Sequence, residues 1–251
     1  MVLLQSSQAA RSQSAAATTV IVVARQDTPL RVAVISDIHA NLHALEAVLG
    51  AIDTDPPDEV WCLGDLVGYG PRPNEATELV RERQRICLVG NHDLAVLGRL
   101  DLDDFAPDAA VTARWTQTVL LDENRAYLES LSPEAKVEGA ELYHGSPRDP
   151  IWEYVIDEWT ARDALESTVA PVVLVGHSHV ALAVRIVDGV VAGGLAPDGT
   201  EVDLAEARWL LNPGSVGQPR DGDPRAAWLE LDGGKARFHR VPYDISRTQA
   251  E

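Results

Sequence analysis

Lysine is nearly absent from this sequence of 251 residues, which contains it only at Lys136 and Lys235. Acidic residues outnumber lysine and arginine by 39 to 21, so the formal net charge is -18. Sequence-blind binding to nucleic acid requires many contacts between cationic side chains and phosphates, and docking on an anionic membrane requires a basic surface. The composition therefore argues against a broad nucleic-acid surface and against a membrane partner, while a bound metal ion is still able to create a local positive site.

Long apolar runs and cysteines are also scarce. No run approaches the roughly 18 apolar residues that a membrane-spanning helix needs. The two cysteines, Cys62 and Cys87, each lie in a short apolar run. We expect two free, buried thiols in a reducing compartment, hence a cytoplasmic protein, and neither a disulfide nor a metal site built on them.

Residues 1–29 differ in composition from the rest of the chain, because they are mostly small and polar. We expect a disordered tail, with a misassigned start or a transit-like segment as alternatives, and the stretch "TTVIVVAR" leaves an added strand open. A secretory signal fits poorly because the basic start and the long apolar stretch are missing. We therefore expect the folded domain to span residues 30–245.

Strands and helices are expected to alternate in the first half of this domain. Strand-type runs cover residues 30–36, 58–65 and 85–91, and helical patterns cover residues 41–52 and 74–83, with Asn41 and Asn74 as N-caps. This alternation predicts a buried, largely parallel sheet. In the second half, strands separated by turns are expected at residues 172–177, 181–189, 208–215, 226–234 and 236–243. The predicted class is α/β, with two packed mixed β-sheets flanked by helices.

Polar side chains gather where these strands end. They are Asp37, His39, Asp65, Asn91, His92, Asp93, His144, His177 and His179, and they include five of the seven histidines. Ligands of open α/β sheets bind at the carboxyl ends of the strands. Each motif alone is weak evidence for a functional site, because such residues also cap helices, close turns or lie in a core. Together they form a mixed nitrogen and oxygen set that suits Mn, Fe or Zn, and the lack of thiolates excludes a zinc-finger type of site.

The blocks "SDIHAN", "GDLVGYG", "GNHD", "LYHGSP" and "GHSH" follow one another in the order D-x-H, G-D, G-N-H-D/E, H, G-H-x-H. In this the sequence resembles the calcineurin-like metallophosphoesterase superfamily, and in particular its small, single-domain prokaryotic phosphoesterases. The blocks run from Asp37 to His179, the strand scaffold extends the resemblance to about Tyr243, and the later "NPGSVGQPR" also occurs among these proteins. The resemblance implies a four-layer sandwich of two β-sheets between helices.

The resemblance also implies two divalent metal ions, for which we expect Mn²⁺, with Fe, Zn or Ni as alternatives. Its ligand set for the first ion corresponds to Asp37, His39, Asp65 and His179, and for the second to Asp65, Asn91, His144 and His177. Asp65 would bridge the two ions. A hydroxide held between them would attack phosphorus, and His92 would assist the leaving group without being a ligand.

One block departs from the pattern of the protein Ser/Thr phosphatases of this superfamily, G-D-x-V-D-R-G. Gly68 replaces the acid that would orient the catalytic histidine, and Tyr69 replaces the phosphate-gripping arginine. This departure argues against a protein phosphatase, and Asp93 or a backbone carbonyl is expected to orient His92 instead. We therefore expect a hydrolase of a small phosphodiester or nucleotide. The alternatives are a phosphomonoesterase, a catalytically idle scaffold and, disfavoured by the charge, a nuclease.

The segment at about 99–135 is expected to be a helical insertion, which is long for a connection. It is either a packing helix pair or a cap that brings Phe105, Arg114 or Trp115 near the substrate. The other candidates for substrate binding are Tyr69, Arg148, Ser215 and Arg220. The expected partner is a small phosphorylated substrate, and the sequence gives no prediction of the oligomeric state.

Overall fold

The computed structural model describes residues 30–251, which form two six-stranded β-sheets. In spatial order, the first sheet contains β3 (Ile86–Cys87), β2 (Glu59–Cys62), β1 (Val32–Ile35), β11 (Ala226–Asp232), β12 (Lys235–Val241) and β9 (Glu201–Asp203). The second contains β4 (Glu134–Val137), β5 (Ala140–Tyr143), β6 (Val172–Val175), β10 (Trp209–Asn212), β7 (Leu182–Val187) and β8 (Val190–Leu195). The tail and added strand expected for residues 1–29 lie outside the described residues.

Both sheets are mixed, as predicted. β1, β2 and β3 run parallel to one another, and so do β5, β6 and β10. The remaining pairs are antiparallel, and β11 joins the first sheet beside β1. The C-terminal strands therefore complete the sheet that begins the domain, and the parallel strands of both sheets direct their carboxyl ends to the site described below.

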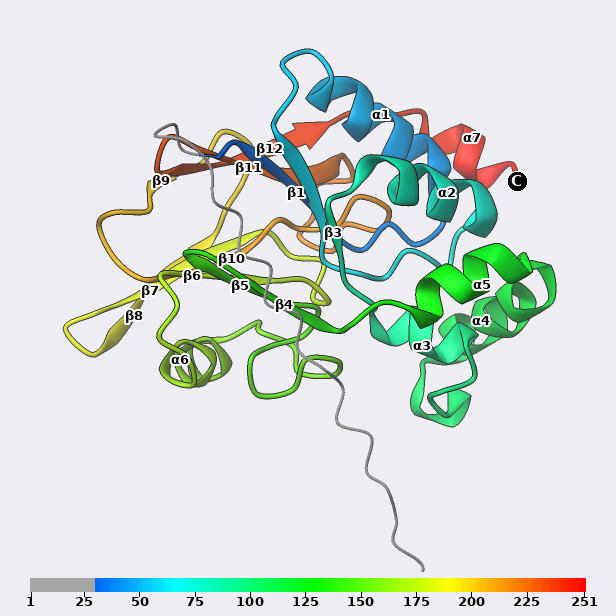
Figure 1. The fold of residues 1–251 in the computed structure, drawn as a ribbon, viewed down its shortest axis with the longest axis horizontal. Coiled ribbons are helices and arrows are strands. Elements are labelled where there is room, and N and C mark those ends of the chain that lie inside the picture. The colour runs from blue at the N-terminus through cyan, green and yellow to red at the C-terminus, as the bar shows by residue number, and fades with distance from the viewer. Residues whose placement is uncertain (1–29) are drawn as a thin grey trace, which may run out of the picture.

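The described residues contain seven α-helices and one short 3₁₀-helix, drawn in Figure 1. They are α1 (Leu42–Ile52), α2 (Pro73–Arg83), α3 (Asn91–Val96), the 3₁₀-helix η1 (Leu102–Asp104), α4 (Pro107–Val119), α5 (Asp122–Glu129), α6 (Glu158–Glu166) and α7 (Ile245–Gln249). Helices α1, α2 and α7 lie together beside the first sheet, α6 packs on the second, and α3, α4 and α5 form a group at one end (Figure 1).

Three apolar clusters show that the layers are helix, sheet, sheet and helix. The alternation along β1 illustrates this, because Val32 and Val34 pack between the sheets while Ala33 and Ile35 face the cluster under α1 and α2. A third cluster lies between the second sheet and α6, and it includes Leu165 of that helix. Alternation of side chains across a buried strand gives each sheet two apolar faces. The predicted two-sheet sandwich is therefore confirmed.

The two predicted N-caps had different outcomes. The side chain of Asn41 accepts a hydrogen bond from the Ala44 N–H and caps α1, as predicted. The prediction for Asn74 was wrong, because α2 begins one residue earlier, at Pro73. Proline suits the first turn of a helix, where its missing N–H would have no partner. The Asn74 side chain instead joins the insertion, since its Oδ1 accepts from the Leu121 N–H at 2.8 Å.

The segment expected to be a helical insertion contains η1, α4 and α5. It is tied to α3, whose Ala95 carbonyl accepts a hydrogen bond from Gln117 at 2.9 Å. Both thiols are free, as expected, but the expected burial holds for Cys62 alone, because Cys87 is half-buried. Across residues 30–251, no helix has the length and apolar character needed to cross a membrane. The domain boundaries at residues 30 and 245 stay predictions.

Candidate metal centre

The polar motifs predicted from the sequence meet at one edge of the fold. The loops that follow β1, β2, β3, β5 and β6 converge there, so both sheets contribute to the site. Two groups of side chains each place their ligand atoms within 4.8 Å of one another, and all their members are buried. The first group is Asp37, His39, Asp65 and His179, and the second is Asp65, His144 and His177. Asp65 belongs to both groups.

Three of these four histidines have a backbone carbonyl opposite the Nδ1 atom. His39 donates to Val67 O at 3.1 Å, His144 to Leu63 O at 2.8 Å and His179 to Gln218 O at 2.7 Å. In the fourth, His177, the Nε2 atom is buried and has no hydrogen-bond partner among residues 30–251. A carbonyl accepts only, so it fixes the neutral imidazole with its proton on Nδ1 and its lone pair on Nε2. The Nε2 lone pairs of His39, His144 and His179 are therefore available to a cation, and Nε2 of His177 is unpartnered.

Two pairs of acceptor atoms face each other in this centre. Nε2 of His39 lies 3.0 Å from Nε2 of His179, and Nε2 of His144 lies 3.1 Å from Oδ1 of Asn91. The three imidazoles carry their protons on Nδ1, where carbonyls accept them. Neither the two Nε2 atoms of the first pair nor the Nε2 and Oδ1 atoms of the second pair have a hydrogen between them. Asn91 thus lies where its predicted role as a ligand requires. A positive ion between such atoms would turn the repulsion of their lone pairs into attraction.

The carboxylate of Asp65 occupies the position of a bridge. Its Oδ1 accepts from the His92 N–H at 2.9 Å, which fixes the orientation of the group. Its Oδ2 lies 3.6 Å from Nε2 of His39 and 3.5 Å from Nε2 of His144. One oxygen of Asp65 thus approaches one imidazole of each group. This is the arrangement that a carboxylate shared by two ions requires.

Several buried atoms of the centre have no hydrogen-bond partner among the described residues. They include Asp37 Oδ2, Asp65 Oδ2 and His177 Nε2. A buried polar atom without a partner costs about 1–3 kcal/mol, so such atoms are rare unless a ligand satisfies them. All three belong to the two groups defined above. The donor set therefore fits divalent metal ions, which would satisfy the unpartnered atoms together.

Burial shifts the protonation of the same residues when no cation is near. It raises the pKa of Asp37 to about 7 and raises the pKa of Asp65 well above its usual range. It lowers the pKa of His177 to about 2 and lowers that of His39 well below its usual value. A nearby metal ion favours the ionised form of the two carboxylates, whose burial otherwise disfavours it, and it binds imidazole in the neutral form. The site is thus built for a cation rather than for protons.

The backbone of the centre is strained. Asp37, His39, Asp65, His177 and His179 have φ angles between 49° and 63°. A non-glycine residue with positive φ is uncommon, although Asn, Asp and His tolerate it better than most. Such strain clusters at functional sites, where the surrounding structure holds it in place. The strained residues aim their side chains at one place, which indicates a function for these loops beyond packing.

His92 differs from the four histidines of the two groups. Its Nδ1 has no hydrogen-bond partner among residues 30–251, and it faces Gly68, where an added Cβ would lie 2.7 Å away. Packing holds the ring instead, with centroids 4.8 Å from His39, 4.7 Å from Tyr69 and 5.3 Å from Phe105. His92 therefore lies beside the centre without sharing the ligand geometry, as its predicted role requires.

The expectation that Asp93 or a carbonyl orients His92 was wrong for this structure. The Asp93 carboxylate accepts hydrogen bonds from the backbone N–H groups of Leu66, Val67 and Gly90. These bonds join the loop after β2 to the first turn of α3. Asp93 is thus a positioning residue that fixes the loops of Asp65 and His92, and it leaves Nδ1 of His92 free.

Two of the four predicted substrate-binding side chains lie at the centre. Tyr69 contacts the rings of His39 and His92. Arg220 donates to Tyr69 Oη at 3.5 Å, and its backbone N–H donates to His179 O at 3.1 Å. An arginine from the far end of the domain thus reaches the tyrosine that stands in place of the expected arginine. This contact was not visible in the sequence.

The other two predicted substrate contacts have different roles. Arg148 forms ion pairs with Glu153 and Asp163 and is directed toward α6. Ser215 is fully buried, and its hydroxyl donates to the backbone carbonyl of Asp37 at 2.7 Å. We therefore correct both assignments. Arg148 stabilises a loop, and Ser215 supports the backbone of a candidate ligand.

The insertion contributes one of its three candidates to the site. Phe105 contacts His92, whereas Trp115 is 42% exposed and lines a surface hollow with Arg72 and Asn74. Arg114 is exposed on the same helix. The insertion therefore touches the site through Phe105 at the end of η1, and most of it packs on α2 and α3.

Sequence reasoning missed two aromatic residues of the loop between β5 and α6. Tyr154 stacks on His177 with a centroid distance of 3.8 Å and an angle of 21° between the rings. Trp152 lies 5.1 Å from Phe105, centroid to centroid. The stretch "RDPIWEYV" carries no motif, and its only signal was its place directly after His144.

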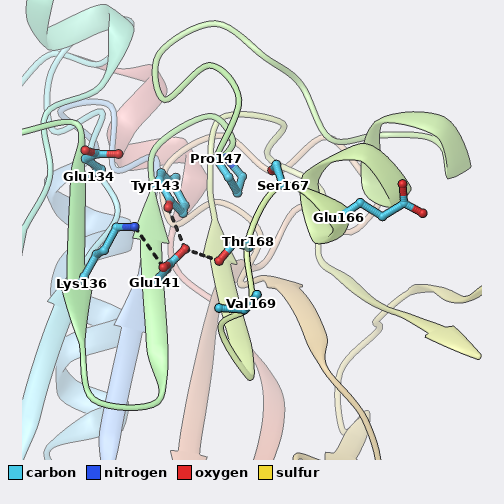
Figure 2. A pocket seen from close by; sticks show the side chains of 9 residues that line it. All are labelled: Glu134, Lys136, Glu141, Tyr143, Pro147, Glu166, Ser167, Thr168 and Val169. Atoms are coloured by element: carbon cyan, nitrogen blue, oxygen red, sulfur yellow. Dashed lines mark hydrogen bonds and ion pairs between the residues drawn. The ribbon is translucent and has the colours of Figure 1, made fainter.

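A hollow of about 420 Å³ beside β4 and β5 lies apart from this centre (Figure 2). Four of its polar side chains satisfy one another, because Glu141 accepts from Lys136 at 3.0 Å, Tyr143 at 2.8 Å and Thr168 at 2.5 Å (Figure 2). None of the predicted site residues lines it. We assign it no ligand.

Comparison with known proteins agrees with this geometry. The chain belongs to the calcineurin-like phosphoesterase superfamily, whose domain model matches residues 30–234. It is 45% identical to a metallophosphoesterase from Sphaerobacter thermophilus, whose crystal structure aligns with a TM-score of 0.80 over 88% of this chain and 91% of that one.

Two proteins that are similar in sequence match different shares of this chain. The uncharacterized protein MJ0912 of Methanocaldococcus jannaschii is 39% identical over 223 residues, or 86% of this chain and 89% of that protein. A symmetrical bis(5'-nucleosyl)-tetraphosphatase of Pseudomonas fluorescens is 31% identical over 109 residues, which are 36% of this chain and 37% of that enzyme. The first likeness covers nearly the whole domain, and the second covers only a part of it.

Proposed function

We propose that the chain is a dinuclear metal-dependent hydrolase of a small phosphodiester or nucleotide. One observation carries the proposal, namely two buried ligand groups that share Asp65 and have His92 beside them. The sharing of one carboxylate supports two ions at short separation, which suits in-line displacement at phosphorus. The whole set comes from loops that the two sheets hold rigidly.

The first ion would be held by Asp37, His39, Asp65 and His179, and the second by Asp65, Asn91, His144 and His177. When bound, such ions supply Lewis-acid stabilisation of the phosphoryl oxygens and an activated water. Mixed imidazole and carboxylate ligands favour Mn²⁺, Fe or Zn over Ca²⁺. We propose Mn²⁺ as the ion that supports activity best.

His92 would transfer a proton to the departing oxygen. Burial lowers the pKa of His92 to about 3, so the ring of the free protein is neutral near pH 7. An anionic substrate beside the ring stabilises its protonated form and raises that pKa toward the working range. The ring keeps its orientation through packing against Tyr69 and His39, since Nδ1 has no partner among the described residues.

Arg220 would hold a non-reacting phosphoryl oxygen. Its guanidinium lies next to Tyr69 Oη and donates to Gln218 Oε1 at 2.6 Å. Among residues 30–251 it forms no direct ion pair with a carboxylate. An arginine with free donors next to a metal centre suits the recognition of phosphate.

The phosphomonoesterase alternative is favoured by this same arginine. Arg220 brings a guanidinium to Tyr69, where the protein phosphatases of the superfamily carry an arginine. A diester or nucleotide is supported by the aromatic rings around His92 and by the partial likeness to a bis(5'-nucleosyl)-tetraphosphatase. The idle scaffold is disfavoured because such a role gains nothing from unpartnered ligand atoms and strained backbone.

One pair of assays separates these readings. With Mn²⁺ supplied, kcat/KM should be higher for bis(p-nitrophenyl) phosphate than for p-nitrophenyl phosphate. Tyr69→Arg should do little for the monoester, because Arg220 already lies at that position. A much higher kcat/KM for the monoester would make the chain a phosphomonoesterase, and no hydrolysis of either ester would favour the scaffold.

The partner would be a small phosphorylated molecule. The net charge of -18 gives no broad surface for nucleic acid. We place the protein in the cytoplasm because both of its cysteines are free thiols, as is usual in a reducing compartment.

A further inference from the structure

Two segments that are distant in the sequence place aromatic rings next to His92. Phe105, at the end of η1, meets the His92 ring edge to face at 5.3 Å. Trp152, in the loop between β5 and α6, lies 5.1 Å from Phe105 at an angle of 57°. Both side chains are half-buried, so part of each ring is accessible. The three rings form a continuous series that starts at His92.

The loop that carries Trp152 is fixed by its own hydrogen bonds. The Gly145 N–H donates to Pro150 O at 2.7 Å, and the Ser146 N–H donates to Asp149 O at 2.9 Å. Asp149 Oδ1 accepts from the Ile151 N–H at 3.1 Å and from the Trp152 N–H at 3.0 Å. The backbone that carries the indole is therefore held in place before any substrate arrives, which lowers the entropic cost of stacking on the ring.

We propose that Phe105 and Trp152 form a stacking site for the planar base of a nucleoside carried by the leaving group. The inference rests on the proposed function, because it takes His92 as the group that faces the departing oxygen. A leaving group that receives its proton from His92 lies on the side of Phe105 and Trp152. Every nucleobase has a π-face, so aromatic stacking binds bases with little dependence on their identity.

The same contact has a purely structural reading, in which Phe105 and Trp152 only join the insertion to the loop. Binding measurements on the metal-loaded protein separate the two readings without depending on turnover. Adenosine 5′-monophosphate and ribose 5-phosphate share the phosphate and sugar and differ in the base. Stacking on one base should favour the first by about 5–150-fold in Kd, measured by titration calorimetry.

Three variants locate the preference. Trp152→Leu and Phe105→Leu keep an apolar side chain at each position and remove the aromatic face, and each should bring the ratio of the two Kd values toward one. Trp159→Leu is the matched control, because Trp159 is 74% exposed at the start of α6. It should leave the ratio unchanged. A variant that weakens both ligands equally, or a wild-type ratio near one, overturns the stacking site.

Hydrolysis then tests the orientation of the base. Two methyl phosphodiesters serve as substrates, one at the 5′ oxygen of adenosine and the other at the 5 oxygen of 1-O-methylribose. The first carries adenine where the second carries a methoxy group. The wild-type protein should cleave the adenosine compound with the higher kcat/KM and release adenosine, and Trp152→Leu should abolish that preference. Release of adenosine 5′-monophosphate and methanol would place the base on the other side and contradict the inference. If bis(p-nitrophenyl) phosphate is not cleaved either, the proposed function fails. The ratio of the Kd values for adenosine 5′-monophosphate and ribose 5-phosphate still shows whether the stacking site exists.

Discussion

Gly90 lies so close to the Asp65 carboxylate that a Cβ atom at this position would sit 2.1 Å from Asp65 Oδ1. No side chain fits in that space, because real Cβ contacts are never so short. The carboxylate that joins the two ligand groups is thus packed directly against the backbone that leads into α3. Glycine is required at this position for close approach and not for its φ angle, which at -102° is open to any residue.

Gly90→Ala should therefore displace Asp65 and disrupt both ligand groups at once. We expect loss of bound metal and a fall in phosphoesterase activity of about 10–10²-fold, comparable to the loss of a group that orients a metal ligand. Mass spectrometry would measure the metal content, and circular dichroism would show whether the fold is retained. Gly50→Ala is the control, since a Cβ at this helical position of α1 meets nothing within 4 Å. Full metal content in Gly90→Ala would show that Asp65 is not confined as described.

Removal of metal should abolish hydrolysis, and the choice of ion should matter on restoration. Mn²⁺ should restore activity better than Ca²⁺, because imidazole nitrogen is a poor ligand for an ion that prefers oxygen. Activity on bis(p-nitrophenyl) phosphate after chelation and re-addition of each ion is the measurement. Restoration by Ca²⁺ as good as that by Mn²⁺ would contradict the role given to the four histidines.

His92→Ala should keep the metals and the fold, because His92 lies outside both ligand groups. Its loss of rate should depend on the leaving group. An alkyl ester needs the proton and should slow by about 10²–10⁴-fold, whereas a nitrophenyl ester departs without it and should keep much of its rate.

His177→Ala supplies the contrast to that variant. It removes a buried ligand atom and should lower metal affinity and slow both esters alike. The measurement is one metal titration and two rates for each variant. Equal losses for both esters in His92→Ala, or loss of bound metal, would assign His92 to metal or phosphate binding.

The loop that carries Arg220 depends on a buried ion pair. Arg240 pairs with Asp221, with side chains only 3% and 8% exposed, and Asp221 also accepts from the Ala181 N–H. Arg240→Leu leaves the Asp221 charge buried and should lower the free energy of unfolding by about 3–5 kcal/mol. Chemical denaturation measures it.

Arg237→Leu on the same strand is the matched control for that prediction. Arg237 pairs with Glu201 at the surface, where its side chain is 51% exposed, so the change should cost only about 0–1 kcal/mol. Adding Asp221→Asn to Arg240→Leu should recover part of the stability, because it removes the stranded charge. Equal losses in Arg237→Leu and Arg240→Leu would show that burial of the pair is not what matters.

Much of the site could be predicted from the sequence, because its ligands lie in short motifs directly after apolar runs. Asp37 and His39 follow β1 of the first sheet and His177 and His179 follow β6 of the second, and within each sheet the parallel strands bring their carboxyl ends to one edge. Each motif and the strand before it lie within a few residues of one another, so both can be recognised from the sequence. The order of the motifs in the chain indicated both the sandwich and the residues that gather at its edge.

What could not be predicted depends on contacts between distant segments. Arg220 meets Tyr69 across 151 positions of the chain, and no pattern near either residue signals this. Ser215 looked like a phosphate ligand, yet it supports Asp37 across 178 positions. Asp93 looked like the partner of His92, but the adjacent loop amides take its oxygens. Sequence motifs give the type of a side chain and its strand, whereas the three-dimensional packing decides its partner.

Electron paramagnetic resonance of the Mn²⁺-loaded protein shows whether two ions share Asp65. We expect a metal analysis of two Mn²⁺ per chain and a spectrum of exchange-coupled ions. In Asp65→Ala that coupling should vanish, while Glu59→Ala, at the start of β2, should leave it intact. One Mn²⁺ per chain with an uncoupled spectrum, or coupling that persists in Asp65→Ala, would contradict the account.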